Sequence, residues 1–443
     1  MAEALTHGHD HPAMTTLQDI ASCISGYDPN ALPVEQAREF ITRLVPRVEV
    51  VESLPIRSAL GRVLARDIVS RINVPASDNS AMDGYALRGG ELRTDAPTTF
   101  AVAGKGFAGQ PFTGPVPPGQ CLRIMTGAVM PAGHDTVVPQ EFVQLAEGQV
   151  TVPAGVVRTG DNRRLAGEDL AIGDAALRAG RILRPADLGL LASLGQAEVP
   201  VFRKLRVAFF STGDELRSVG EALDAGCVYD SNRYTLWGML QRLGFEVLDL
   251  GVVRDDPQAL AQAFRHAADN ADAVITSGGV SVGEADHTKQ VMAQLGDVLF
   301  WTIAMRPGRP MAIGRLTGGS KSSGGSGAIL FGLPGNPVAV MVTFYAFVRD
   351  ALLAMSGATP QPLPLLRVAS AHAIRKKPGR TEYQRGVVVR GADGVQTVGI
   401  TGSQGSGILR SMSTANGLVV LHHEQGNVAA GDMVDVLPFD GLI

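Results

Sequence analysis

One local plan recurs several times between residues 205 and 355: a short apolar run, a turn rich in Gly, Ser, Asp or Pro, and then a segment of helical periodicity. The apolar runs are residues 205–210, 246–250, 271–276, 297–303 and 328–332. Strands that alternate with helices in this way are typical of βαβ units and of a doubly wound sheet. Because the turns after parallel strands lie along one edge of such a sheet, the plan predicts a ligand-binding crevice at that edge.

The predicted helices begin at capping residues. Asp230 is placed to cap a helix that continues to about residue 243, and Asp256 caps another whose first turn contains Pro257. Pro337 opens a helix that extends to residue 355. Residues 328–348 contain no charged side chain, but Pro-Gly-Asn-Pro at 334–337 divides them into strand, turn and helix. This stretch is therefore predicted to be buried core and not a membrane span.

The turn SGGVSVGEAD, residues 277–286, combines glycines with carboxylates. Its glycines let the backbone turn tightly and approach a ligand, so that N–H groups can cradle an anion. Glu284 and Asp286 supply oxygens of the kind that Mg²⁺ prefers. A glycine turn with solvated acids is the alternative, but the neighbouring strand ends favour a metal-assisted phosphate site. The residues expected to converge there are Glu215, Asp255, Asp286, Arg306 and Asn336.

Composition argues against several classes of protein. A length of 443 residues exceeds what one core usually spans, so about three or four domains are expected. The net charge of −4 and the lack of a dense Lys/Arg run argue against a nucleic-acid surface. Cys23, Cys121 and Cys227 form no CxxC pair, which indicates a reducing cytosol and no structural zinc site. The N-terminal segment lacks a basic start and an apolar core, so a cytoplasmic location is expected.

The regions on either side of the βαβ plan differ from it. Helical periodicity at 33–44 and 56–69 precedes a Gly/Pro-rich, β-branched stretch at 98–157, and a helical segment returns at 187–194. This order predicts a mixed N-terminal part with a β-rich part inserted into it. After residue 359 a proline linker leads into alternating segments, which predict a small C-terminal β barrel.

Two short patterns offer alternative sites. Residues 104–109 match GxGxxG, but the prolines that follow exclude the helix that a dinucleotide requires. Residues 279–283 match GxSxG, in which Ser281 would be a nucleophile. Its formal acid and base partners are Asp297 with His372, His422 or His423. Nothing in the sequence places these partners near Ser281.

An ordered set of motifs resembles one known family. The motifs are DNSAMDGYA (78–86), RIMTGA (123–128), RRLAGEDL (163–170), STGDEL (211–216), YDSNR (229–233), RDDP (254–257), SGGVSVGEAD (277–286), MRPGRP (305–310) and LPGNPVA (333–339). Taken in this order they look like those of the molybdopterin molybdenumtransferases, to which the C-terminal region of gephyrin is related. The resemblance extends from about residue 32 to the C-terminus.

This resemblance, together with the sequence plan, implies a multidomain α/β fold. A central βαβ domain of the nucleotide- or pterin-binding kind is expected at 204–358, and a small β barrel at 365–443. Residues 32–203 form the N-terminal region, with its β-rich part at about 73–157, and residues 1–31 are expected to be a disordered tail.

The resemblance also implies an activity. Molybdenum from molybdate is inserted into the dithiolene of adenylylated molybdopterin, AMP is released, and Mg²⁺ is the expected metal. The implied partners are adenylylated molybdopterin, molybdate, a second subunit that shares the active site, and the molybdopterin adenylyltransferase; no nucleic acid or membrane is expected. The alternatives are an ATP-dependent molybdopterin adenylyltransferase and a non-catalytic dimeric scaffold. Molybdate and tungstate are not distinguished by these residues.

The family pattern marks site residues position by position. Catalytic roles fall on Asp83, Glu215, Asp255 and Asp286, of which Asp255 and Asp286 are the expected metal ligands. Substrate-binding roles fall on Thr126, Asp169, Ser211, Gly213, Ser277, Gly278, Gly279, Arg306, Arg309, Pro334, Gly335, Asn336, Pro337 and Ser406. One position departs from the pattern, because Thr302 stands where many relatives have lysine. Arg306 is therefore expected to supply the missing positive charge.

Overall fold

The chain forms two compact units in the computed structural model, which describes residues 16–280, 287–317 and 327–440. The first unit comprises Met1–Glu52, Gly61–Ala65 and Pro200–Ile443, and the second comprises Ser53–Leu60 and Arg66–Val199. Each unit has hydrophobic cores of its own. The domain boundaries that were expected near residues 204 and 365 stay predictions.

The first unit is built on a six-stranded sheet with strand order β16-β13-β17-β21-β20-β18. Its strands are β13 (Arg206–Thr212), β16 (Glu246–Val253), β17 (Ala273–Ser277), β18 (Gly296–Thr302), β20 (Pro310–Leu316) and β21 (Ala328–Leu333). Strands β16, β13, β17 and β21 are parallel, and β20 is antiparallel to both of its neighbours. Strand β18 therefore runs in the same direction as the parallel four, and the carboxyl ends of these five strands share one edge.

Five of these strands confirm the predicted apolar runs, whereas β20 was not predicted. Its continuous apolar run, residues 311–313, is too short to stand out in the sequence. The strand exists because the turn after β18 returns the chain alongside it, with Trp301 paired to Met311. Long-range pairing therefore decides this strand, and local periodicity does not.

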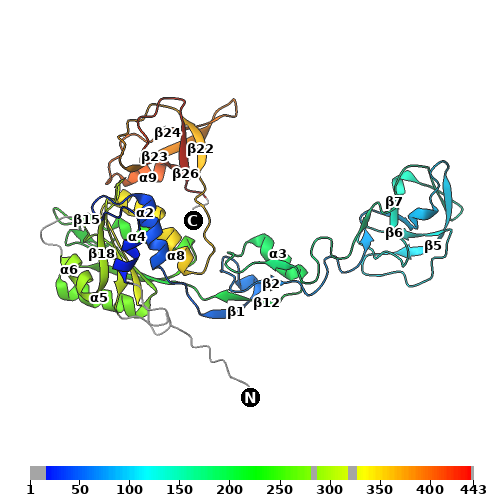
Figure 1. The fold of residues 1–443 in the computed structure, drawn as a ribbon, viewed down its shortest axis with the longest axis horizontal. Helices are drawn as coiled ribbons and strands as arrows, with labels where there is room; N and C mark the ends of the chain where they lie inside the picture. The colour runs from blue at the N-terminus through cyan, green and yellow to red at the C-terminus, as the bar shows by residue number, and fades with distance from the viewer. Residues whose placement is uncertain (1–15, 281–286, 318–326, 441–443) are drawn as a thin grey trace, which may run out of the picture. The chain divides into compact units, whose positions relative to one another are not determined.

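Helices cover both faces of this sheet (Figure 1), which confirms the doubly wound arrangement. The helices that follow its strands are α4 (Ser231–Arg242), α5 (Pro257–Asn270), α6 (His287–Leu295) and α7 (Pro337–Thr343). Residues Ala208 and Phe210 of β13 pack toward α5 and α6, whereas Val207 and Phe209 belong to the core that contains α4 and α7. Successive side chains of a strand point to opposite faces, so every other residue of β13 serves one helical layer.

The predicted capping residues begin α4 and α5. Asp230 accepts a hydrogen bond from the Arg233 N–H at 3.1 Å, and Asp256 accepts one from the Ala259 N–H at 2.8 Å. Each carboxylate satisfies one of the N–H groups that a helix start leaves without a partner. Pro257 occupies the first turn of α5, where its missing N–H costs nothing.

The helix that begins at Pro337 continues through a π-helical turn, Phe344–Val348, into α8 (Arg349–Met355). Its composition and length would suffice to cross a membrane, but 72% of its most apolar window is buried inside the protein. Phe344, Phe347 and Leu352 lie in the largest core cluster of the first unit. The prediction of a buried core helix is therefore confirmed for this segment.

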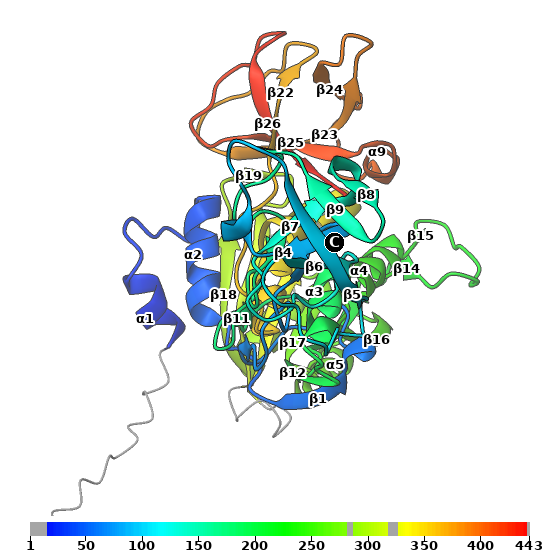
Figure 2. The ribbon, with the colours of Figure 1, turned by 90° about the vertical axis from the view of Figure 1, so that its right-hand side faces the viewer.

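Two N-terminal helices, α1 (Leu17–Ser22) and α2 (Val34–Leu44), join the same core, and Figure 2 shows them beside β18. Thr16 caps α1 with a capping box to Asp19. Trp301 of β18 donates a hydrogen bond to the Tyr27 hydroxyl at 2.8 Å, and its ring meets Phe40 edge to face. The predicted disordered tail of residues 1–31 was therefore too long, because Leu17, Ile20, Ala21 and Ile24 are buried in this core.

The C-terminal part of the first unit is a closed β barrel, as predicted. Its strands are β22 (Leu366–Ser370), β23 (Thr381–Arg390), β24 (Gln396–Ile400), β25 (Gly417–Leu421) and β26 (Met433–Pro438). They follow the order β23-β24-β22-β26-β25, and β25 pairs back onto β23 to close the ring. A short strand β19 (Met305–Arg306), in the turn after β18, pairs with the start of β23 and so joins the barrel to the sheet edge.

The second unit contains a six-stranded β sheet, which confirms the predicted β-rich part. Its strands, in the order β7-β4-β6-β5-β9-β8, are β4 (Gly84–Leu87), β5 (Thr98–Gly106), β6 (Gln120–Ile124), β7 (Thr136–Pro139), β8 (Gln144–Ala146) and β9 (Gln149–Val152). The first half of the GxGxxG pattern lies in β5, and no α-helix occurs between residues 98 and 184, all of which the structure describes. The dinucleotide pattern is therefore correctly discounted.

The remaining elements of the N-terminal region include one correction. They are β1 (Val51–Pro55), β2 (Ile68–Val69), β3 (Asn79–Ser80), β10 (Arg163–Arg164), β11 (Ala175–Leu177), β12 (Glu198–Phe202) and α3 (Pro185–Ser193). Helix α3 confirms the predicted helix at 187–194, but the helix predicted at 56–69 is wrong. The helical part of that segment is a single 3₁₀ turn, Ile56–Ser58, and the segment ends in strand β2. Gly61 adopts a positive φ of 74°, and Leu64 pairs with Val201.

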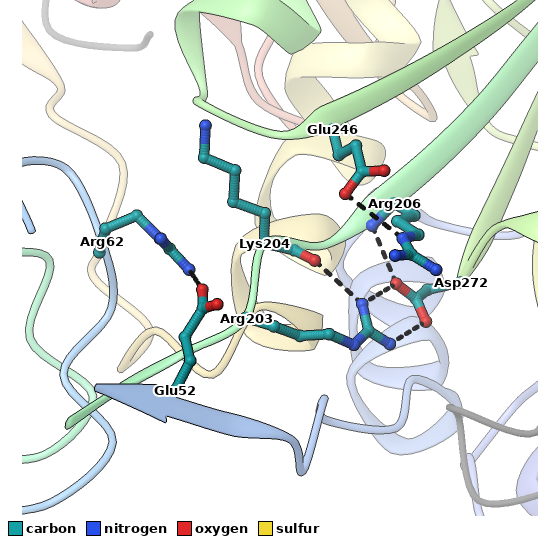
Figure 3. Close-up of polar contacts among 7 residues, drawn as sticks. All are labelled: Glu52, Arg62, Arg203, Lys204, Arg206, Glu246 and Asp272. Atoms are coloured by element: carbon teal, nitrogen blue, oxygen red, sulfur yellow. Dashed lines mark hydrogen bonds and ion pairs between the residues drawn. The ribbon is translucent and has the colours of Figure 1, made fainter. Parts of the chain in front are cut away.

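An ion-pair group anchors the chain where it enters the sheet at β13 (Figure 3). Arg203 forms two hydrogen bonds of 2.7 Å with the Asp272 carboxylate, which also accepts the Arg206 backbone N–H at 2.8 Å. The side chains of Arg203 and Asp272 are only 12% and 7% exposed. Next to them Arg62 pairs with Glu52 and donates to the Phe202 carbonyl at 2.8 Å.

We expect Asp272→Ala to lower the free energy of unfolding by about 3 kcal/mol, because the change leaves the Arg203 charge buried without its partner. Urea unfolding followed by circular dichroism measures this. Asp224→Ala is the control, since its pair with Arg217 joins a carboxylate that is 66% exposed, and it should cost less than about 1 kcal/mol. Equal losses of unfolding free energy in the two variants would show that the buried Arg203–Asp272 pair stabilises the fold no more than an exposed pair does.

Candidate active site

The carboxyl edge of the sheet collects the turns in which most of the predicted site residues lie. The backbone N–H of Asp255, after β16, donates to the Asp214 carboxylate, after β13, at 3.3 Å. Beyond β17 and β21, the Gly278 N–H donates to the Leu333 carbonyl at 3.1 Å. The turns after four parallel strands are thus linked in pairs, as expected of a doubly wound sheet.

Several buried polar atoms along this edge have no hydrogen-bond partner within the described residues. They are Ser211 Oγ, Thr212 Oγ1, Thr276 Oγ1, Asp230 Oδ2, Asn232 Oδ1, Asp255 Oδ1 and Thr288 Oγ1. They belong to the ends of β13 and β17, to the turn after β16, and to the starts of α4 and α6. Buried polar groups without partners are costly and uncommon, so their concentration indicates a place where polar ligand groups or water complete the bonding.

The glycines of the predicted anion cradle are required by close packing. Gly278 has a φ of 96°, and a Cβ at this position would lie 2.5 Å from the Thr212 carbonyl oxygen. Gly279 has a φ of 67°, and its Cβ would lie 2.4 Å from the Thr288 hydroxyl. The expectation of free N–H groups needs one correction, since the Gly278 N–H is already bound to Leu333. Gly213, whose φ is 148°, lies beneath the Glu215 carboxylate.

The predicted acids occupy different environments. Asp255 is half-buried, and its Oδ1 lacks a partner within the described part of the chain. Glu215 is exposed, and its carboxylate folds back over Gly213. Asp286, with Glu284 and Ser281, lies outside the described residues. Among the residues that are described, no group of three or more His, Cys, Asp or Glu side chains could hold a metal ion. Of the two predicted metal ligands, Asp255 and Asp286, Asp255 lies within the described residues.

A cavity of about 490 Å³ lies next to these turns, between the sheet edge and the barrel. Its lining contains Arg306, Pro307, Gly308, Arg309, Pro310, Pro334, Gly335, Asn336, Ala339, Gln404, Gly405 and Ser406. Six predicted substrate-binding residues are in this lining, and Pro337 directly follows Asn336 at the start of α7. Arg306 and Arg309 are both exposed, so their guanidinium groups can meet a ligand from solution.

A buried arginine that the sequence did not single out supports this cavity. Arg385 of β23 is fully buried and donates to the Ser411 hydroxyl at 2.9 Å and to the Gly405 and Gln404 carbonyls at 2.8 and 3.2 Å. Burial lowers the pKa of Arg385, and the positive charge of Arg306 lowers it further. Arg385 stays charged because arginine loses its proton only at very high pH. The cavity wall therefore carries concentrated positive charge, which suits an oxyanion.

The second unit brings two predicted residues together. The Asp83 carboxylate accepts hydrogen bonds from both the backbone N–H and the hydroxyl of Thr126, each at 2.7 Å. The backbone N–H of Thr126 and then its hydroxyl lower the pKa of Asp83, so the carboxylate is ionised at neutral pH. Asp169 is also exposed, but its turn is held by a separate bond from its own N–H to the Val74 carbonyl.

We expect Thr126→Val to raise the pKa of Asp83, because the hydroxyl bond to the ionised carboxylate is lost while the backbone bond remains. A titration of the Asp83 carboxyl carbon by NMR measures the change. Thr151→Val, which removes an exposed hydroxyl paired only with Thr99, is the control and should leave the pKa of Asp83 unaltered. An unaltered pKa in Thr126→Val would mean that the backbone N–H alone sets it.

The GxSxG alternative is not supported by the described residues. Asp297, its proposed acid, lies near the start of β18 and accepts the Leu17 N–H at 3.3 Å. The pattern itself follows the carboxyl end of β17, and β17 and β18 run in the same direction. Asp297 is therefore at the opposite edge of the sheet. His422 is paired with Asp435 on the barrel at 2.7 Å.

Comparison with known proteins accounts for almost the whole chain. Family models for the MoeA N-terminal region (domains I and II), a probable molybdopterin binding domain and the MoeA C-terminal region (domain IV) match residues 32–195, 208–354 and 367–439. A molybdopterin molybdenumtransferase of Haemophilus influenzae is 42% identical over 93% of this chain and 100% of its own length. The chain belongs to the molybdopterin molybdenumtransferase family.

Other members share both sequence and fold. A molybdopterin molybdenumtransferase of a Nostoc species is 34% identical over 91% of this chain and 93% of its own length. The crystal structure of the molybdopterin biosynthesis MoeA protein from Pyrococcus horikoshii OT3 matches with a TM-score of 0.77 and 28% identity. It covers 93% of this chain and 100% of that one. These matches confirm the resemblance and the multidomain α/β fold expected from the sequence.

Position 302 can now be compared with the site. Thr302 ends β18, its N–H donates to the Pro29 carbonyl at 2.7 Å, and its own carbonyl accepts the Leu32 N–H at 3.1 Å. Thr302 is not among the residues that line the cavity, whereas Arg306 is. The residues that sequence reasoning missed are Thr212, Asp230, Asn232, Thr276, Thr288, Arg385, Gln404 and Gly405. Two of them, Asp230 and Asn232, lie in the YDSNR motif, whose residues were given no site role from the sequence.

Proposed function

We propose that this enzyme inserts molybdenum from molybdate into the dithiolene of adenylylated molybdopterin and releases AMP. The curated relatives are named for the transfer of molybdenum to molybdopterin, and the adenylylated substrate and the AMP product are the finer part of the proposal. In this reaction the dithiolene sulfurs replace oxo ligands of molybdate, and each displaced oxo ligand takes up two protons and leaves as water. A further water molecule cleaves the phosphoanhydride bond that holds AMP.

The observation that carries the proposal is the arginine-lined cavity beside the sheet edge. Arg306 and Arg309 can bind an oxyanion through planar pairs of N–H donors. Arg385 adds positive charge behind them and holds the 403–405 turn through its carbonyls. The glycine turn after β17 is next to this cavity, since Gly335 of the lining would place a Cβ 3.8 Å from the Gly278 Cα. Molybdate and the molybdopterin phosphates can thus be held next to each other.

Mg²⁺ is proposed as the metal, with Asp255 as the described residue that would hold it. The Oδ1 of this carboxylate has no partner among the described residues, which fits such a role. When bound, the metal would neutralise negative charge on the phosphate that leaves with AMP. Asp255 itself contributes a fixed negative charge and, through its backbone N–H, orients the Asp214 carboxylate.

The assembly and location are also proposals. We propose a cytoplasmic homodimer in which Asp83 and Thr126 of one subunit complete the site of the other, as the family pattern implies. Both residues are exposed and bonded to each other, so this polar pair is accessible to a second subunit. Contact with a molybdopterin adenylyltransferase would deliver the adenylylated substrate directly.

A reconstituted assay tests the function. Purified chain is incubated with adenylylated molybdopterin, molybdate and Mg²⁺, and AMP and molybdenum-loaded cofactor are measured. We expect both products without added ATP. If AMP-linked product forms only from ATP and unmodified molybdopterin, the chain is an adenylyltransferase instead. If neither set of substrates is consumed, a scaffold role replaces the enzymatic one.

A further inference from the structure

Asn232 has no role in the proposed chemistry, yet it forms a bond to each of two binding turns. It is the second residue of α4 and is 7% exposed. Its Nδ2 donates to the Ser277 hydroxyl at 2.7 Å and to the Gly335 carbonyl at 2.7 Å. Ser277 is the last residue of β17 and leads into the glycine turn, and Gly335 lines the arginine cavity after β21.

The hydrogen bonds determine how the Asn232 amide is oriented. The Gly335 carbonyl can only accept a hydrogen bond, so the NH₂ group of Asn232, and not its oxygen, must face it. Both hydrogens of this group are then used, one for each turn. The Oδ1 atom points away from these partners and has none of its own within the described residues.

Other contacts hold Asn232 and the two turns in register. Asp230 caps the start of α4 through the Arg233 N–H, which fixes the helix turn that presents Asn232. Strands β17 and β21 are adjacent, with Ser277 paired to Leu333, and the Gly278 N–H donates to the Leu333 carbonyl. Beyond these strand ends, Asn232 is a further link between the glycine turn and the cavity turn.

We propose that Asn232 is a positioning residue that sets the glycine turn and the arginine cavity at a fixed separation, so that molybdopterin and molybdate meet in reacting geometry. This inference rests on the proposed function, because it assigns the two turns to the two substrates. Loss of the link leaves each turn able to bind its own ligand. What is lost is the alignment of the two ligands, to which rate is very sensitive.

Asn232→Asp is the sharpest variant. It keeps the size of the side chain but places a carboxylate oxygen against the Gly335 carbonyl, so that an attraction becomes a repulsion. We expect turnover to fall at least about thirtyfold while the Kd values for AMP and for molybdate change by less than about threefold. Asn270→Asp is the matched control, because Asn270 also donates from Nδ2 to a backbone carbonyl, that of His266, but at an exposed helix end.

A local readout separates this inference from the proposed function. Hydrogen exchange followed by mass spectrometry reports on the Gly278 amide, and we expect it to exchange at least about tenfold faster in Asn232→Asp than in the wild type, without any substrate present. A wild type that releases no AMP would end the proposed function but leave this result intact. Unaltered exchange and unaltered turnover in Asn232→Asp would overturn the positioning role.

A second pair of variants covers the case in which Asn232→Asp fails to fold. Asn232→Ala removes both bonds, and Ser277→Ala removes one of them. The double variant combines Asn232→Ala with Ser277→Ala. If Asn232 acts partly through Ser277, the fold-loss of turnover in the double variant should be smaller than the product of the fold-losses in the two single variants. Fully multiplicative losses would show that the two residues act independently and would count against the link.

Discussion

Asp255→Asn is expected to lower the rate of AMP release at least about a hundredfold, which is the usual loss when one group aimed at developing charge is removed. The change keeps the shape of the side chain and removes its charge. Asp255 is suited to this role because its Oδ1 is buried and without a partner within the described residues, next to the Asp214 carboxylate. Initial rates at saturating substrates measure the effect, and circular dichroism checks the fold.

The neighbouring acid provides the control. Asp256 is exposed and caps α5 through the Ala259 N–H at 2.8 Å. Asparagine is an equally good capping residue, so Asp256→Asn should keep stability and activity within about a factor of three of the wild type. Comparable activity of the Asp255→Asn and Asp256→Asn enzymes would show that Asp255 is a solvated turn residue and not part of the reaction.

Arg306→Ala is expected to raise the molybdate concentration needed for half-maximal rate by about a hundredfold, because one arm of a charged oxyanion clamp disappears. Arg306→Lys should recover part of this loss, since it restores the charge but not the planar pair of donors. Thr302→Lys in the Arg306→Ala background should also restore part of it, because it adds a positive charge at the position where the family pattern implies lysine. A molybdate concentration series on these proteins measures each step.

Arg367→Ala is the matched control for charge. Arg367 is an exposed barrel arginine that lines a different cavity, with Arg390 and Met433. Its removal changes the net charge as Arg306→Ala does but leaves the lining described above intact. An Arg306→Ala enzyme with the molybdate dependence of Arg367→Ala would remove Arg306 from the site and leave the missing charge at position 302 unexplained.

The arginine cavity shows why only part of the site was predictable. Arg306, Arg309 and the turn at 334–337 are contiguous in sequence with strand ends, so their position at the sheet edge follows from the βαβ plan. Arg385 is one of three charged residues in β23, and its partners are backbone carbonyls at 403–405 together with Ser411. Every residue has a backbone carbonyl oxygen, so no pattern of side chains in the sequence predicts that Arg385 bonds to the carbonyls at 403–405.

What the sequence determined by itself was local. Apolar runs and the caps at Asp230 and Asp256 encode strands and helix starts through interactions between near neighbours, which is why these predictions held. The tertiary structure alone decided strand β20, the loss of the helix expected at 56–69, and the bonds from Asn232 to Ser277 and Gly335. Each of these depends on segments distant in sequence, whose pairing is settled by packing of the whole chain and not by local propensity.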